Sequence, residues 1–277
     1  MALLRAYDVL WSLEIQPHHP ELVYDAIQQA WFNGFYTRGI QMDVVSPTSN
    51  LSGYRVVVAP ALFLADAALG ARLADFVKHG GTLMLTFRSG VKDPENVATE
   101  RTLPGVFAEV CGVEVSEYDC LDVGETRQVE LHTDGDSPVN CQARWWTDAL
   151  RTTTASVLGT YASDYMAGQP AVTENAFGDG RALYVGTHLD DDGVAMLVDY
   201  MAGATGLRTL SRQVIPGVEI SVRQSEEREL VFVMNHADEP RSIPVEVGTD
   251  VFSGESLSGE LTIPARDLRI VERRPSP

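Results

Sequence analysis

The sequence predicts an α/β domain built on an open, doubly wound and mostly parallel sheet, followed by a small antiparallel β domain. Three observations carry this prediction: a strand–helix–strand unit within residues 52–91, an alternation of strands and helices over residues 2–90, and a change of pattern from Ile215 onward. Strands that alternate with helices build parallel sheets, whereas short strands divided by turns build antiparallel ones.

The strand–helix–strand unit is the clearest of these elements. Residues 54–59 form an apolar, β-branched run, which is typical of a strand buried on both faces of a parallel sheet. Residues 65–78 carry apolar side chains at intervals of three and four, the spacing of an amphipathic helix, and Gly80 and Gly81 end it. Residues 82–87 are a second buried strand. A crossover of this kind places both strands in one parallel sheet.

The other segments of the first domain alternate in the same way. A strand begins at residue 2, directly after Met1, so we expect the chain to derive from a longer one. A turn rich in large side chains follows at residues 8–14. Further helices are expected at residues 20–35, 103–112 and 193–206, and further strands at residues 40–45, 129–132, 155–161, 169–174 and 181–188.

From Ile215 the pattern becomes that of an antiparallel β domain. Residues 217–223 alternate apolar and polar side chains, and the later short strands are separated by Gly, Pro, Asp and Ser. Such spacing is typical of antiparallel strands joined by tight turns, and we expect a small β-sandwich. The sequence therefore predicts two domains, residues 1–210 and residues 211–277.

The charge argues against two kinds of partner. The chain has 21 Lys and Arg against 39 Asp and Glu, which gives a net charge of −18. Nucleic acids and anionic membranes are bound by basic surfaces, so we expect neither as a partner. A sugar, another neutral ligand or a protein partner is compatible with this charge.

The composition also predicts a compartment. No apolar run approaches the roughly 20 residues of a membrane span, and the start lacks the cationic and apolar regions of a signal peptide. The three cysteines, Cys111, Cys120 and Cys141, have no CxxC spacing, which favours free thiols over a metal site. We therefore expect a cytoplasmic protein without a metal or a cofactor.

Nucleophilic catalysis is the first chemistry to consider for such a sheet. A nucleophile on the sharp turn after the central strand, with a His base and a carboxylate, is the plan of class I glutamine amidotransferases. The turn at residues 86–90 contains no cysteine, and Ser89 does not lie in a G-x-S-x-G motif. His188 and Asp190, after the last core strand, are candidates for the base and the acid. The alternative interpretation is that His188 is a hydrogen-bonded structural residue.

Metal and phosphate sites are weakly indicated. The carboxylates of residues 190–192 follow His188, and His18 precedes His19, but neither spacing matches a calcium or zinc motif. The favoured interpretation of residues 190–192 is an N-cap for the helix that follows. Residues 178–180 are predicted to form a hairpin turn and not a nucleotide-binding loop.

Three tryptophans in predicted loops and turns, together with Glu14, are candidates for binding or interface contacts. Trp31 lies on the side of its predicted helix that faces the protein core. Trp11, Trp145 and Trp146 fall outside the predicted helices and strands, where large apolar side chains must be shielded from water by other groups. Such aromatic residues are typical of interface anchors, of sugar-stacking platforms, or of ordinary packing.

The sequence resembles the non-catalytic part of a known enzyme family, the glycoside hydrolase family 42 β-galactosidases. The matching stretches occur in the same order from residue 2 to about residue 236. The last forty residues resemble the family only in their general pattern. The matching stretches are Tyr7–Asp8, Trp11–Glu14, Gly39–Val45, Leu51–Pro60, Gly80–Leu83, Ser89–Gly90, Pro104–Gly105, Trp145–Asp148, Gly168–Ala171, Asn175 with Gly178 and Gly180, Tyr184–Thr187, Gly217–Glu219 and Asn235–His236.

The resemblance implies an enzyme of three parts: a catalytic TIM barrel, an amidotransferase-like trimerisation domain and a small β-sandwich. This chain would hold the second and third parts. The family's acid/base and nucleophile glutamates lie on the barrel, as does its metal-binding cysteine cluster, so no residue of this sequence inherits those roles. A retaining glycosidase needs two carboxylates about 5 Å apart on barrel strands.

We therefore expect a non-catalytic scaffold that holds a homotrimer together and works with a catalytic barrel domain or subunit. The expected interface residues are Trp11, Glu14, Trp145 and Trp146. Two alternatives stay open: an amidotransferase-like hydrolase that uses His188 and Asp190, and a carbohydrate-binding module that senses galactosides at the strand-end crevice.

Overall fold

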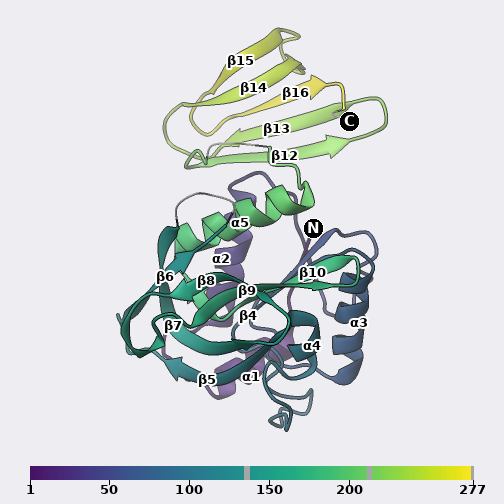
Figure 1. Cartoon of the computed structure of the whole chain (residues 1–277). Helices are drawn as coiled ribbons and strands as arrows, with labels where there is room; N and C mark the ends of the chain where they lie inside the picture. The colour runs from purple at the N-terminus through teal and green to yellow at the C-terminus, as the bar shows by residue number, and fades with distance from the viewer. Residues whose placement is uncertain (134–137, 211–213, 276–277) are drawn as a thin grey trace. The chain divides into compact units, whose positions relative to one another are not determined.

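The computed structural model describes residues 1–133, 138–210 and 214–275. In it the chain forms two compact units (Figure 1). The α/β unit comprises Met1–Phe32 and Asp43–Thr205, and the β unit comprises Asn33–Met42 and Gly206–Pro277. The domain boundary after residue 210 stays a prediction, because residues 211–213 beside it lie outside the described residues.

The α/β unit contains one mixed sheet with the strand order β11-β7-β6-β8-β9-β10-β4-β3-β1-β2, and β5 pairs with β7. Strands β4 to β10 of this sheet are labelled in Figure 1. The parallel part consists of β1 (Ala2–Leu4), β2 (Asp43–Val45), β3 (Val56–Ala59), β4 (Thr82–Thr86) and β10 (Gly180–Val185). The antiparallel part consists of β5 (Val113–Cys120), β6 (Thr126–Leu131), β7 (Val139–Thr152), β8 (Ser156–Tyr161), β9 (Pro170–Phe177) and β11 (Thr187–Leu189).

The prediction of a mostly parallel sheet is wrong for the second half of this unit. Parallel neighbours need a crossover of about a dozen residues or more, usually a helix. From β5 to β11 the described residues contain only one helical element, the 3₁₀ helix η2 (Asp164–Met166). Strands without helices between them pair antiparallel, so the sheet is parallel only where α-helical crossovers exist.

Five α-helices occur in the part of the chain that the structure describes: α1 (Tyr7–Ile15), α2 (Tyr24–Tyr36), α3 (Ala67–Lys78), α4 (Ala108–Cys111) and α5 (Asp191–Thr205), with the 3₁₀ helix η1 (Gly105–Phe107) before α4. Helix α3 packs on β4, β9 and β10, and α5 packs on β7 and β11. None of the helices in the described ranges is long and apolar enough to cross a membrane.

Two placements differ from the sequence prediction. Residues 8–14, predicted as a turn, belong to helix α1. Its large side chains lie on both faces of the helix, with Leu13 buried but Trp11 56% exposed. The apolar residues therefore do not follow the spacing of three to four residues that would indicate a helix. Trp145 and Trp146, predicted in a loop, lie within the long strand β7. The interpretation of Trp31 is confirmed, because its side chain is buried on α2.

The predicted strand–helix–strand unit is present as β3, α3 and β4. Every residue of both strands is buried, as expected for the centre of a parallel sheet. Asp66 caps α3, because its Oδ1 accepts a hydrogen bond of 2.7 Å from the amide of Leu69. Gly80 follows the helix with φ +96°, the conformation that ends it at low steric cost.

Two glycines shape the loop after β4. Gly90 and Gly105 have φ values of +67° and +65°, a region that side chains rarely adopt. A Cβ on Gly90 would lie 2.2 Å from the carbonyl oxygen of Pro104, and one on Gly105 would lie 2.4 Å from that of Gly90. The two backbones are therefore in direct contact, which explains why glycine stands at both positions.

We expect Gly90→Ala to lower the free energy of unfolding of the α/β unit by about 2 kcal/mol or more, since it combines a strained φ with a backbone clash. Gly203→Ala, in α5, is the matched control: a Cβ there meets nothing within 4 Å. Alanine at that helical position should be neutral or stabilising by about 0.5–1 kcal/mol. Urea denaturation followed by circular dichroism measures both, and equal stability of Gly90→Ala and the wild type would contradict the packing.

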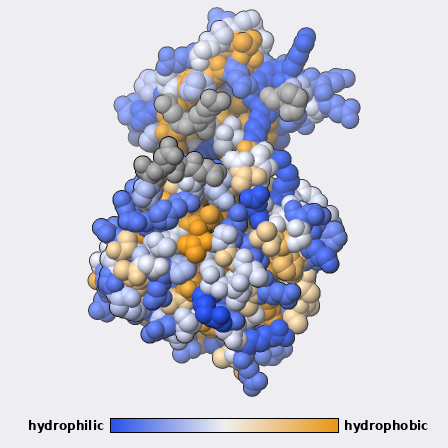
Figure 2. All heavy atoms as spheres, viewed as in Figure 1, coloured by the Kyte–Doolittle hydropathy of each residue, from blue (hydrophilic) through white to orange (hydrophobic). Residues whose placement is uncertain are grey.

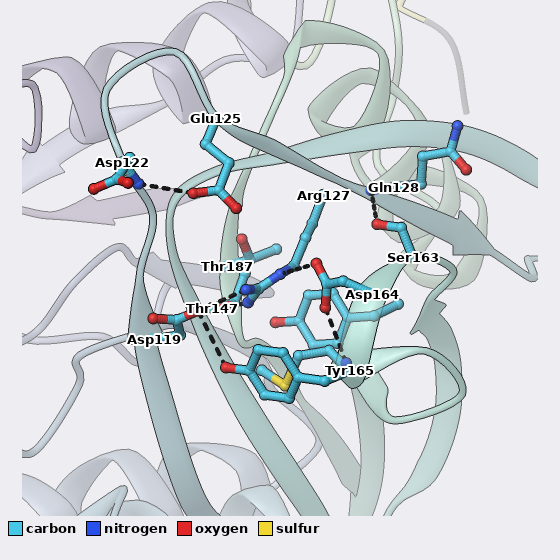
Figure 3. A network of polar contacts seen from close by, with 12 residues as sticks. Asp119, Asp122, Glu125, Arg127, Gln128, Thr147, Ser163, Asp164, Tyr165 and Thr187 are labelled. Carbon is cyan, nitrogen blue, oxygen red and sulfur yellow. Dashed lines mark hydrogen bonds and ion pairs between the residues drawn. The ribbon is translucent and has the colours of Figure 1, made fainter.

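A buried arginine joins the antiparallel strands (Figure 3). The side chain of Arg127 on β6 is 4% exposed and contacts two carboxylates at 2.5 Å, Asp119 on β5 and Asp164 on η2. Its Nη1 also donates to the hydroxyl of Thr147 on β7, and its guanidinium lies 4.9 Å from the ring of Tyr165. Because its partners come from β5, β7 and η2, Arg127 fixes how these three segments meet.

The β unit contains one antiparallel sheet with the order β12-β13-β16-β14-β15, so the prediction of an antiparallel domain is confirmed. Its strands are β12 (Val218–Gln224), β13 (Glu229–Asn235), β14 (Arg241–Asp250), β15 (Ser256–Ile263) and β16 (Leu268–Arg273). The strands form one continuous sheet and not the two sheets of a sandwich. Its core is built by Val231, Val233, Ile243, Leu261, Ile263 and Val271.

Candidate functional site

The turn after β4, the position considered above for a nucleophile, carries Arg88. Arg88 has φ +61°, an uncommon conformation for a residue with a side chain. The turn is held on both sides: the amide of Phe87 donates to the carbonyl of Val185 at 2.7 Å, and that of Gly90 donates to Leu62 at 2.9 Å. The sheet therefore builds the sharp turn, and the side chain presented by it is a cation.

The guanidinium of Arg88 is enclosed by aromatic rings. The residue is 5% exposed, and its Cζ lies 4.6 Å from the ring centres of both Phe63 and Trp146. Its Nη1 lies 2.9 Å from Nδ1 of His18, which must be the acceptor because a guanidinium only donates. Burial lowers the pKa of Arg88 to about 10, so it remains a cation at neutral pH.

A buried carboxylate lies under this turn. Asp148 on β7 is 3% exposed and accepts hydrogen bonds from Nε1 of Trp146 at 2.8 Å and from the hydroxyl of Tyr184 at 2.9 Å. Burial raises the pKa of Asp148 to about 7, although these donors and Arg88 oppose the shift. Arg88, Trp146 and Asp148 thus form one packed polar cluster at the strand ends.

The hydroxyl of Ser89, the substitute nucleophile considered above, is engaged with the backbone. Ser89 is 1% exposed, and its Oγ donates to the carbonyl of Thr86 at 2.7 Å. The same oxygen accepts from the amide of Leu62 at 3.2 Å. This side chain therefore stabilises the turn through two hydrogen bonds.

His188 on β11 lies beneath an indole ring. Trp145 stacks on it with the ring centres 4.0 Å apart and the planes at 5°. Burial, helped by Arg144, lowers the pKa of His188 to about 4, so the imidazole is neutral at physiological pH. Trp145 itself has φ +67° and donates its Nε1 proton to Glu21 at 3.1 Å. The indole therefore covers one face of the histidine and connects β7 to the loop before α2.

Asp190, the predicted acid partner, caps helix α5. Its Oδ1 accepts from the amide of Gly193 at 3.0 Å, and its Oδ2 accepts from the amide of Gln142 at 2.9 Å. The N-cap interpretation of this carboxylate is thus confirmed by its contacts. Within the described ranges, no group of three or more His, Cys, Asp and Glu residues is arranged to hold a metal ion.

The predicted interface residues separate into two sets. Trp146 and Trp145 contact Arg88 and His188 respectively, at the strand ends. Trp11 and Glu14 are exposed on α1, where the ring of Trp11 lies 6.1 Å from that of Tyr7.

Sequence reasoning missed Arg88, Asp148 and His18 as members of the site. Arg88 is the one charged residue of the turn at residues 86–90, a signal that could have drawn attention to it. Asp148 ends the stretch Trp145–Asp148 that the resemblance includes, but its partner Tyr184 lies on another strand, β10.

Comparison with known domains defines the class of protein. The model of the β-galactosidase trimerisation domain matches residues 1–208, and that of the β-galactosidase C-terminal domain matches residues 217–273. The chain therefore belongs to glycoside hydrolase family 42 and carries these two domains. The resemblance predicted from the sequence is confirmed.

Individual relatives agree with this assignment. The chain is 33% identical to the β-galactosidase Pbg of Clostridium perfringens, over 99% of this chain and 41% of that protein. It is similar to the crystal structure of a β-galactosidase from Bacillus circulans sp. alkalophilus, with 30% identity, a TM-score of 0.92, and coverage of 98% of this chain and 41% of that one. The β-galactosidase structure from the Antarctic haloarchaeon Halorubrum lacusprofundi has a TM-score of 0.87 at 30% identity, with coverage of 99% and 39%. The chain thus spans about two fifths of the length of these relatives.

We expect His188 to remain neutral down to about pH 4, against an ordinary value of 6.5. A lowered pKa means that the unfolded chain binds the proton more readily, so this group contributes stability that is complete above pH 6.5 and falls as the pH decreases toward 4. Trp145→Ala should expose the ring and raise the pKa of His188 toward its ordinary value. NMR titration of the histidine ring protons measures this, with assignment by His188→Gln.

Trp11→Ala is the control for this titration, because Trp11 is exposed on α1 and should leave the His188 signal unchanged. A wild-type His188 that titrates near 6.5 would contradict the burial beneath Trp145.

Proposed function

We propose that this chain is the assembly part of a family 42 β-galactosidase and that it carries out no chemistry itself. Its α/β unit would be a class I amidotransferase-like domain that has lost the reactive groups. The enzyme to which it contributes would act on β-galactosides, the substrate class that the names of its relatives print, through a separate TIM-barrel domain or subunit. The matching domain descriptions and the coverage of about 40% of each relative support this proposal.

The single observation that carries the proposal is the content of the turn after β4. The parallel strand order β2-β1-β3-β4-β10 supports the flavodoxin-like relation, and the turn after β4 has the strained backbone of a nucleophile position. The side chain there is the enclosed guanidinium of Arg88, which is a cation and no nucleophile. The two other candidates are engaged, His188 beneath Trp145 and Asp190 at the start of α5.

Helix α1 offers a surface for assembly. Tyr7, Trp11 and Ile15 are spaced by four residues and are 62%, 56% and 74% exposed, so they form one row, which we call the α1 stripe. The face of the molecule in Figure 2 is mainly hydrophilic with small separate apolar patches. Large apolar side chains gathered on one helix are typical of a protein interface. We assign the α1 stripe, with Glu14 beside it, to contacts between copies of this chain in a homotrimer.

Two further assignments belong to the proposal. We keep the domain boundary near residue 210, between the two matched domains. We also place the assembly in the cytoplasm, in agreement with three cysteines that are free thiols. Cys111 and Cys141 are buried, and burial raises the pKa of both thiols, which keeps them unreactive.

We expect the purified chain to have the mass of a trimer by light scattering after size exclusion. The double variant Trp11→Glu/Ile15→Glu should place charges on the α1 stripe and shift the chain to monomer, with at least a tenfold increase in the dissociation constant. Val247→Glu in β14, at a position 77% exposed, is the matched control and should remain trimeric. A wild-type monomer at high concentration, or an unchanged double variant, would refute this assignment.

We also expect no hydrolysis of a chromogenic β-galactoside by the chain alone, when it is produced in a host that lacks its own β-galactosidase. The two carboxylates of a retaining glycosidase project from barrel strands, which the matched domains do not include. Turnover that survives purification of the trimer and scales with its concentration would sink the proposal.

A further inference from the structure

The buried cation of Arg88 lacks a full counter-charge. Among the described residues, no carboxylate forms an ion pair with its guanidinium within 4.0 Å, whereas Arg127, also buried, forms two. Its Nε is buried without a hydrogen-bond partner. A charged group with unsatisfied donors costs several kcal/mol to bury unless an anion compensates it.

Asp148 compensates Arg88 only in part. Its two oxygens accept from Trp146 and Tyr184, so its charge is directed toward protein donors. Burial raises the pKa of Asp148 to about 7, so burial disfavours the charged form of this carboxyl group. The aromatic rings and the neutral His18 that surround Arg88 supply no net charge.

A cavity of about 220 Å³ adjoins this guanidinium. One part of its wall is basic, with Arg88, Lys92 and His18. The rest of the wall combines apolar side chains, among them Phe63, Leu103 and Val115, with polar ones that include the carboxylate of Asp148. The ammonium of Lys92 lies 5.5 Å from the ring of Phe63 and 3.1 Å from Oδ1 of Asn96, so a second cation is held at the same wall.

We propose that this cavity binds a small organic carboxylate. Its carboxylate group would lie against Arg88 and Lys92, and its short aliphatic body would pack on Leu103 and Val115. The size suits an acid of a few carbon atoms, since drug-sized ligands occupy larger pockets. A phosphate fits less well, because its additional oxygens would face apolar side chains and the carboxylate of Asp148. The ligand would be held inside the assembly domain, independently of galactoside chemistry.

Titration of the full chain with sodium butyrate at constant ionic strength tests this proposal. Isothermal calorimetry should give saturable binding with a dissociation constant at least tenfold lower than for butyramide, which has the same shape without the charge. Inorganic phosphate should likewise bind at least tenfold more weakly, and butyrate should raise the melting temperature in a saturable way. Absent butyrate binding, or equal affinity for butyramide, would overturn the proposal. Phosphate that binds as tightly as butyrate would overturn the assignment to an organic carboxylate.

Variants locate the site. Lys92→Met should weaken butyrate binding at least fivefold, and Arg88→Met should abolish it if the variant folds. Arg101→Met removes the same charge from an exposed position outside the cavity and should leave binding within twofold of the wild type. Lys92 is half-buried in the loop after the turn, so we expect Lys92→Met to fold. This variant therefore tests the site even if Arg88→Met does not fold. Butyrate binding unchanged in Lys92→Met would place the ligand elsewhere and refute the assignment.

Discussion

The enclosure of the Arg88 guanidinium between two aromatic rings is the interaction on which the strand ends of the α/β unit depend. Phe63 comes from the loop after β3, Trp146 from β7 and His18 from the segment after α1, so one side chain joins three distant segments. The turn that presents it needs a left-handed residue, and the contact between Gly90 and Gly105 closes the loop beyond. The side chain at this turn is thus a buried cation that contributes through packing and hydrogen bonding.

The polar groups near Arg88 are likewise held by contacts within the domain. The imidazole of His188 lies beneath Trp145, the carboxylate of Asp190 begins a helix, and the hydroxyl of Ser89 bonds to the backbone of its own turn. Asp148 receives two side-chain hydrogen bonds at the centre of the cluster. Each of these groups therefore has a structural partner. This agrees with a domain whose proposed work is to hold copies of the chain together through an exposed face such as that of α1.

The sequence predicted the elements whose patterns are local and uninterrupted. The buried runs of β3 and β4 and the spacing of α3 gave the parallel centre, and the short alternating strands after Ile215 gave the β unit. Helix α1 was not predicted because Trp11 and Ile15 are exposed, so the apolar residues of the helix do not lie on one face. The antiparallel direction of the strands in the second half of the sheet was not predicted, because strand direction depends on the segments that connect the strands and not on composition.

The site itself could be predicted only in outline. The absence of cysteine from the turn was visible in the sequence, and so was the carboxylate of Asp190 two residues after His188, but the structure gives these two side chains separate contacts. The partners of Arg88 were not, because Phe63, Trp146 and His18 are far from it in the chain and meet only when the sheet forms. Residues 33–42 show the same limit: they belong to the β unit, although they precede most of the α/β unit in the chain.

The most direct test of an unreactive crevice is intact-mass spectrometry of the folded chain after incubation with a fluorophosphonate, which labels activated serine hydroxyls. The account predicts an unchanged mass, because the hydroxyl of Ser89 is buried and bonded to the backbone and His188 is covered. A stoichiometric adduct on Ser89 that disappears in His188→Gln would contradict it.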